Sequence, residues 1–157
     1  MLANVLAGAA IAGVLFAVFQ LAQVRKQRRR GFEDMFVQRY WDIMDRLSLP
    51  AIEATRPADG RVSPDDRRVV ISYIRLCEDE LDLRAERWIR ADTWELWRSG
   101  MTMQLRRWPF EDIWREVSAR EEAADGQFAR LRAAGPELFT SSYDVPAVGG
   151  LRLWRGR

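Results

Sequence analysis

Histidine is absent from this sequence of 157 residues, and cysteine occurs once, at Cys77. Without histidine the chain cannot form a serine–histidine or cysteine–histidine nucleophile pair, and a structural zinc site of cysteines and histidines is excluded. A single cysteine cannot form an intramolecular disulfide, which fits a reducing compartment. Cys77 follows Tyr73 and Ile74 at helical spacing, which predicts a buried structural thiol rather than a reactive one.

Other signatures of catalysis or cofactor binding are also missing. The chain has no glycine-rich phosphate loop and no serine in a nucleophile-elbow context. A cluster of carboxylates could bind magnesium or act in acid–base chemistry, but Glu78, Asp79 and Asp82 fall on the polar face of a predicted helix, where Arg75 can pair with the first two. The cluster consists of Glu78, Asp79, Glu80 and Asp82. We therefore expect no enzyme, no cofactor and no metal site.

Lysine occurs only at Lys26, and the positive charge is unevenly distributed. Residues 1–24 carry no charged side chain, residues 25–47 carry seven basic and four acidic side chains, and the remaining 110 residues have a net charge of −1. A nucleic-acid-binding domain carries its own basic field. The sequence therefore predicts no nucleic-acid partner.

An uncharged apolar segment runs from Leu2 to Val24. As a helix, its 23 residues would span about 35 Å, enough to cross a hydrocarbon core of about 30 Å. A cleaved signal peptide requires positive charge before the apolar run. Here the basic residues follow the run, at Arg25, Lys26, Arg28, Arg29 and Arg30. The positive-inside rule then predicts a single-pass protein of the cell (inner) membrane, with its amino terminus outside and its C-terminal domain in the cytoplasm.

Two features of this region suggest contacts within the membrane and at its surface. Ala9, Gly13 and Ala17 are spaced four residues apart on one face, a pattern that allows close approach of two membrane helices. Homo-oligomerisation through this face is one alternative, and the ordinary abundance of small residues in membrane helices is the other. The basic cluster sets the topology and can also contact anionic lipid headgroups.

After the anchor, the sequence predicts an all-α protein. Apolar residues at intervals of three and four predict an amphipathic juxtamembrane helix over residues 25–47, and the prolines of residues 48–63 indicate a linker loop. A small helical bundle is predicted over residues 64–134, with Ser63 as an N-cap and Asp92 opening a capping box with Glu95. Residues 135–157 are predicted to form an irregular tail. The expected core of the bundle comprises Tyr73, Cys77, Leu81, Trp94, Trp97, Met101, Ile113 and Trp114.

Glu80 and Arg84 are the exceptions to the pattern of the helix that starts at Pro64. Both fall inside its apolar arc, four residues apart. A lone buried charge is strongly disfavoured, so we expect each to have a partner. Two arrangements fit this expectation: the two residues pair with each other in a buried structural ion pair, or Glu80 accepts from an arginine or from an indole N–H of the tryptophan-rich helices.

Three stretches of the sequence resemble a family of bacterial single-pass membrane proteins of unknown function. They begin at Ser72 (SYIRLCEDEL), Trp88 (WIRADTWELW) and Trp108 (WPFEDIW). The resemblance covers residues 1–134 and implies an N-terminal anchor, a basic juxtamembrane helix and a compact tryptophan-rich helical domain. The family has no established activity, so the resemblance implies no active site.

Two functions remain open on these observations. One is a membrane-tethered cytoplasmic helical interaction module that belongs to, or recruits, a membrane-associated assembly through an unknown protein partner. The other is a membrane-active effector, encoded by a phage or linked to defence, whose transmembrane helix oligomerises. The aromatic core of the soluble domain favours the first, and the stripe of small residues favours the second.

Overall fold

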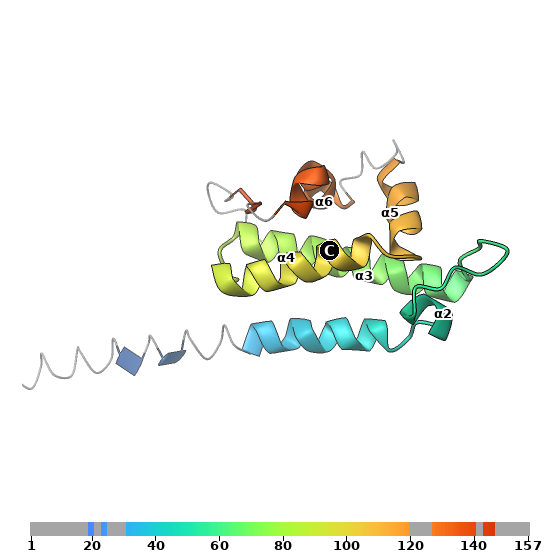
Figure 1. Cartoon of the computed structure of the whole chain (residues 1–157). Coiled ribbons are helices and arrows are strands. Elements are labelled where there is room, and N and C mark those ends of the chain that lie inside the picture. The colour runs from blue at the N-terminus through green and yellow to red at the C-terminus, as the bar shows by residue number, and fades with distance from the viewer. Residues whose placement is uncertain (1–18, 21–22, 25–30, 120–126, 141–142, 147–157) are drawn as a thin grey trace, which may run out of the picture. The chain divides into compact units, whose positions relative to one another are not determined.

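The described part of this computed structural model comprises residues 19–20, 23–24, 31–119, 127–140 and 143–146. It contains helices and turns and no strand, so the predicted all-α class is confirmed. The chain divides into two compact units, residues 1–38 and residues 39–157, and each is considered separately. Figure 1 shows the helices of the second unit.

The predicted membrane segment lies mostly outside the described residues. The same is true of its small-residue face (Ala9, Gly13 and Ala17) and of the basic cluster at residues 25–30. Among the residues that the structure does describe, no helix combines the length and the apolar character that crossing a membrane requires. The anchor therefore stays a prediction from the sequence.

A helix over residues 31–44 accounts for the described part of the predicted juxtamembrane helix, and residues 45–47 form turns after it. In the first unit, the rings of Phe32 and Phe36 stack with their centroids 5.9 Å apart. In the second unit, Tyr40 meets Tyr73 edge to face, and Ile43 is buried.

The predicted linker contains one short helix, α2 (Leu49–Ile52). Pro50 suits its first turn because proline lacks an N–H that this turn would leave unpaired, and Ala51 is buried. Four residues are too few for the apolar periodicity that marks longer helices in a sequence, which explains why the pattern did not reveal α2.

The second unit is organised around α3 (Pro64–Ala85), its longest described helix. Ser63 accepts a hydrogen bond from the Asp66 N–H at 3.0 Å, which confirms the predicted N-cap. One face of α3 is buried along its whole length and packs against α5 and α6.

The next helix, α4 (Ala91–Leu105), begins one residue before the predicted capping box. Its N-cap residue is Arg90, and no side chain caps it. Asp92 lies inside the first turn and receives two hydrogen bonds from the Arg90 guanidinium. Glu95 pairs with Arg98. The predicted box is therefore wrong: both of its carboxylates bind arginines two and three residues away in the sequence.

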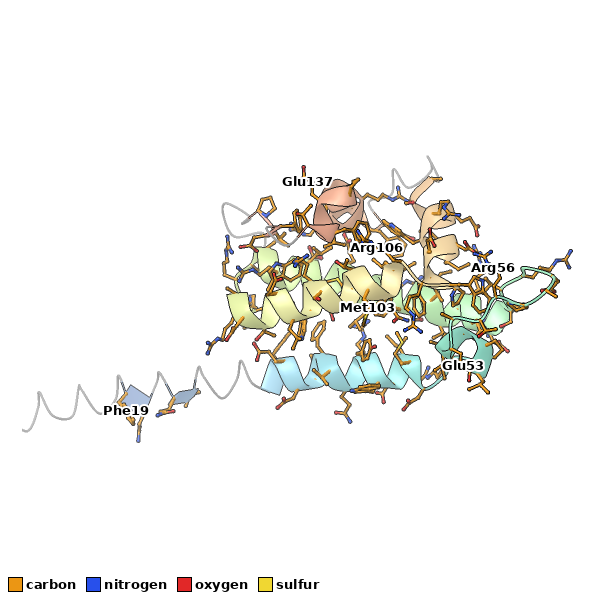
Figure 2. The ribbon with its side chains drawn as sticks, in the orientation of Figure 1. Phe19, Glu53, Arg56, Met103, Arg106 and Glu137 are labelled. Carbon is orange, nitrogen blue, oxygen red and sulfur yellow. The ribbon has the colours of Figure 1, made fainter. Side chains whose placement is uncertain are left out.

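The remaining elements are α5 (Phe110–Ala119), α6 (Ala129–Ala134) and the 3₁₀ helix η2 (Gly135–Phe139). The predicted irregular tail thus opens with a turn of helix, and Gly135 enters it with φ +47°. Leu138 and Val145 are buried, so this part of the tail is docked. Arg106, the C-cap residue of α4 (labelled in Figure 2), lies over the Phe139 ring, 4.8 Å from its centroid.

The predicted core is buried at six of its eight positions: Tyr73, Cys77, Leu81, Trp94, Met101 and Ile113. Trp97 and Trp114 are instead half-exposed. Phe110 is fully buried and meets Tyr73 edge to face with ring centroids 5.2 Å apart, although it was not in the predicted core. Phe110 begins its helix, where periodicity is weakest, and only the packing of α5 on α3 brings it inside.

Candidate interaction groove

The buried face of α3 holds its neighbours through charged side chains. Arg84 is 7% exposed and forms a bidentate pair with Asp144, with both N–O distances 2.7 Å. A third N–H of Arg84 donates to the Ile89 carbonyl at 2.8 Å. The hydrogen bonds from Arg84 lower the pKa of Asp144 to about 2, against a smaller upward effect of burial. This pair ties the tail to the C-terminal end of α3.

Glu80 is also buried, at 8% exposed, but it does not pair with Arg84. Within the described residues it makes no hydrogen bond or ion pair. The indole N–H of Trp94, which was a candidate partner, donates to the Tyr143 carbonyl. The predicted Glu80–Arg84 pair is therefore corrected: an aspartate 60 residues away takes the guanidinium in a bidentate geometry.

Burial is the main reason that the pKa of Glu80 is raised to about 8, and the charge of neighbouring Asp79 raises it further. Arg39 acts in the opposite direction, but its guanidinium is bound to Asp79 at 2.7 Å. Glu80 is therefore largely protonated at neutral pH. A neutral carboxyl group is far less costly to bury than a carboxylate, which explains how α3 tolerates it.

The other carboxylates of the acidic cluster point to different partners. Glu78 accepts the backbone N–H groups of Arg130 and Leu131 at 2.8 and 2.9 Å, at the start of α6. Asp79 pairs with Arg39, and Asp82 pairs with Arg130. In the part of the chain that the structure describes, no group of three or more acidic or cysteine side chains is placed to hold a metal ion. The acidic cluster therefore does not form one site, because Glu78, Asp79 and Asp82 each bind a different group.

Asp66 secures the other end of α3. Its carboxylate accepts the N–H and the hydroxyl of Ser48, both at 2.8 Å, and the hydroxyl of Ser63 at 2.7 Å. Burial tends to raise the pKa of Asp66, but these hydrogen bonds outweigh it, and the net pKa is lowered. The segment that follows residue 47 is thereby fixed to the first turn of α3.

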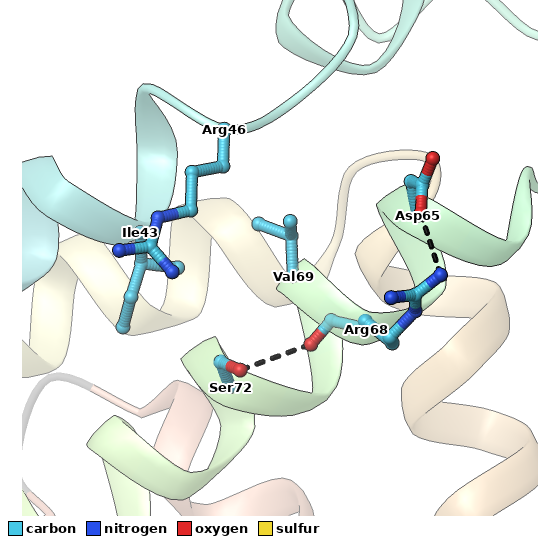
Figure 3. A pocket seen from close by; sticks show the side chains of 6 residues that line it. All are labelled: Ile43, Arg46, Asp65, Arg68, Val69 and Ser72. Carbon is cyan, nitrogen blue, oxygen red and sulfur yellow. Dashed lines mark hydrogen bonds and ion pairs between the residues drawn. The ribbon is translucent and has the colours of Figure 1, made fainter.

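A groove lies between residues 39–46 and the opposite, exposed side of α3. It consists of two hollows, of about 510 and 310 Å³, that share Ile43, Arg46 and Ser72. Figure 3 shows the larger hollow, with Val69 between Arg46 and Arg68 and with Ile43 beside Arg46. We call the two hollows together the arginine groove, and its full lining is Arg39, Asp42, Ile43, Arg46, Asp65, Arg68, Val69, Ser72 and Arg75.

Four arginines and two aspartates give the arginine groove a net charge of +2. Arg46 and Arg75 are exposed and have no ion-pair partner among the described residues. Arg68 pairs with Asp65 at 2.7 Å, in a contact whose side chains are 77% and 84% exposed. Such exposed pairs contribute little and exchange readily with other partners. The expected pairing of Arg75 with the acidic cluster does not form, because those carboxylates are engaged elsewhere.

Sequence reasoning did not identify the arginine groove. Its walls do carry a local signal, because Arg39, Asp42 and Arg46 are spaced by three and four residues, as are Arg75, Ser72 and Arg68 on α3. Each triplet alone is an ordinary polar helix face. Only the antiparallel meeting of the two segments, marked by the Arg39–Asp79 pair, brings the triplets together.

The chain matches no known protein family, curated protein or solved structure. The resemblance to bacterial single-pass membrane proteins stays a prediction.

Proposed function

We propose that this protein is a membrane-tethered interaction module whose helical unit binds a protein partner in the cytoplasm. The arginine groove carries the proposal, because it offers unpaired guanidinium groups beside an apolar floor. A basic groove of this kind is unexpected on a unit whose residues 39–157 have a net charge of −1. Concentrated charge at one open site supports recognition of a complementary surface.

The tether rests on the sequence of residues 2–30. An uncharged apolar run long enough to span a bilayer is followed directly by five basic residues, which places the amino terminus outside and the helical unit inside the cell membrane. In this arrangement the basic cluster lies at the cytoplasmic surface, where each charge attracts anionic lipid by about 1 kcal/mol. The proposal includes no catalytic activity.

Two apolar side chains on α4 provide further support. Leu96 and Met103 are 72% and 62% exposed and lie seven residues apart, on one face of the helix (Figure 2 labels Met103). Large exposed apolar side chains on one helix face are typical of contact surfaces when they occur together.

The test combines topology with partner capture. A periplasmic reporter fused to the C-terminus should be inactive and a cytoplasmic reporter active; the reverse result would refute the tether as oriented. The full chain is then cross-linked in native membranes, purified and compared with the double variant Arg46→Gln/Arg75→Gln. The matched control, Arg61→Gln/Arg115→Gln, removes the same charge outside the groove. A partner retained by all three proteins would exclude the groove as its binding site.

A second function is favoured by one observation, the four-residue spacing of Ala9, Gly13 and Ala17. Oligomerisation through this face would make the protein a membrane-active effector. Overexpression should then depolarise the cell membrane, and Gly13→Leu should abolish the effect because leucine prevents close helix approach. Unchanged membrane potential in overexpressing cells would exclude this function.

A further inference from the structure

Within the proposed function, the arginine groove has a geometry that indicates the class of its partner. Arg39 and Arg46 are seven residues apart on one wall, and Arg68 and Arg75 are seven residues apart on the other. At a rise of 1.5 Å per residue, the backbones of Arg68 and Arg75 are about 10 Å apart along α3. Arg46 lies in the turn that follows the helix of residues 31–44, and it lines the smaller hollow together with Arg39 and Arg75.

A single phosphate or carboxylate group is too small to bind all four arginines of the two hollows at once, since a direct hydrogen bond spans only about 3 Å. An elongated ligand with several negative charges can do so. A helix whose acidic residues recur every seven positions presents them about 10 Å apart on one face. This spacing matches that of Arg68 and Arg75 on the α3 wall of the arginine groove.

The floor of the groove has a different character from its walls. Ile43 and Val69 contribute apolar side chains to the larger hollow, and the Ser72 hydroxyl donates to the Arg68 carbonyl (Figure 3). An apolar side chain that lies between two acidic residues of a ligand helix would rest on this floor. The ligand that fits is thus both acidic and amphipathic.

We propose that the arginine groove binds an acidic amphipathic helix of a partner protein, with carboxylates seven residues apart and an apolar residue between them. Arg46 and Arg75 receive the carboxylates directly, because neither has a partner to give up. Arg39 and Arg68 exchange their exposed contacts with Asp79 and Asp65 for contacts with the ligand. This inference rests on the proposed function and names the chemistry of the partner.

The probe is a synthetic alanine-based helical peptide of about 20 residues, long enough to be partly helical in isolation. It carries glutamates every seven residues and leucines between them on the same face. Binding to the full chain, held in nanodiscs of neutral lipid, is measured by fluorescence anisotropy. The native protein should bind the peptide, and Arg46→Gln/Arg75→Gln should weaken binding about tenfold, because two arginine–carboxylate contacts are lost.

Two controls decide whether the groove geometry matters. The charge-matched variant Arg61→Gln/Arg115→Gln should bind like the native protein, and a scrambled peptide of equal charge should bind at least tenfold more weakly. Equal losses in both double variants, equal binding of the scrambled peptide, or no binding at all would overturn the proposal. Circular dichroism of each variant verifies that the helical fold is intact.

Other occupants give different results. Saturating inorganic phosphate that displaces the peptide at matched ionic strength would assign the groove to a small anion. Peptide binding abolished only by phosphatidylglycerol in the nanodisc would assign it to lipid headgroups, and a dimer lost in Arg46→Gln/Arg75→Gln would assign it to a second copy. Each of these results overturns the acidic-helix proposal. The topology reporters report on the tether alone, so failure of the tether is distinguishable from failure of the groove.

Discussion

The two sides of α3 use charged residues in opposite ways. On the buried side, Asp66 and Arg84 each hold a segment distant in the sequence, the stretch after residue 47 and the tail, and the half-buried Glu78 holds the start of α6. On the side of the arginine groove, Arg75 has no partner among the described residues and Arg68 has only an exposed local one. Desolvation explains the difference. A buried charge must be paired to be tolerated, whereas an exposed charge can remain available to a partner.

Glu80 tests this contrast because it is buried and lacks a partner in the described residues. Arg84 lies one turn further along and is fully paired. The two side chains are accommodated differently. Arg84 stays charged and pairs with Asp144, whereas Glu80, with a pKa of about 8, remains protonated at neutral pH. Substitutions on the buried side of α3 should therefore destabilise the protein at Arg84 and stabilise it at Glu80.

The largest effect is expected for Arg84→Met. It removes two hydrogen bonds to Asp144 and leaves the Ile89 carbonyl without its donor, so the free energy of unfolding should fall by roughly 3–4 kcal/mol. Denaturant unfolding of the full chain in detergent micelles, followed by tryptophan fluorescence, measures the loss. Arg87→Gln is the control, because Arg87 also contacts Asp144 but is 51% exposed; it should cost less than about 1 kcal/mol. Similar losses in both variants would contradict the anchoring role of Arg84.

Glu80→Gln should have the opposite sign and stabilise the protein at neutral and alkaline pH. The pKa of Glu80 is raised in the folded state, so this carboxyl group costs stability as pH rises from about 4.5, where the unfolded chain ionises, to about 8. Each pH unit in this window costs at most about 1.4 kcal/mol. A gain on the order of 3 kcal/mol is therefore expected at pH 8.

The pH dependence of that gain provides the control. Below about pH 4.5 the carboxyl group is neutral in both states, so Glu80→Gln and the native protein should unfold at the same temperature. Thermal melts at closely spaced pH values between 4 and 8.5 measure the difference. A variant that is less stable than the native protein at pH 8 would show that Glu80 is ionised and has a partner.

A smaller loss is expected for Glu78→Gln. The carboxylate accepts one hydrogen bond on each oxygen, from the N–H groups of Arg130 and Leu131, whereas glutamine has only one side-chain oxygen to accept them. Losing such an N-terminal contact costs about 0.5–2 kcal/mol. Hydrogen exchange at the amides of α6 should increase locally. Unchanged exchange in α6 would contradict the contact, and Asp65→Asn, in an exposed pair on the groove side, serves as the neutral comparison.

The smallest effect on stability is expected in the arginine groove. Arg46→Gln/Arg75→Gln removes two exposed and unpaired charges, so the free energy of unfolding should change by no more than about 0.5 kcal/mol. Differential scanning calorimetry measures this change. A loss above about 2 kcal/mol would mean that the groove stabilises the fold and would remove the contrast between the two sides of α3.

The all-α class, the start of α3 at Ser63 and most of the buried core could be predicted from local sequence. Apolar periodicity over many turns and a serine–proline helix start act within a few residues, so they can be recognised without the rest of the chain. Burial of Glu80 and Arg84 followed from the same helical phase. Short elements such as α2 and η2 lie below the length at which periodicity is informative.

Partner choice was decided only by the tertiary structure. Arg84 pairs with an aspartate 60 residues away and not with the glutamate one turn away. Glu78, which the sequence places on a solvated face, accepts backbone N–H groups at the start of α6. The arginine groove exists only because residues 39–46 meet α3. The physical reason is the sequence distance over which each feature acts. Apolar periodicity and helix caps depend on residues within one helix, whereas ion pairs between segments and grooves depend on which helices pack together. That packing depends on how the loops bring distant parts of the chain together.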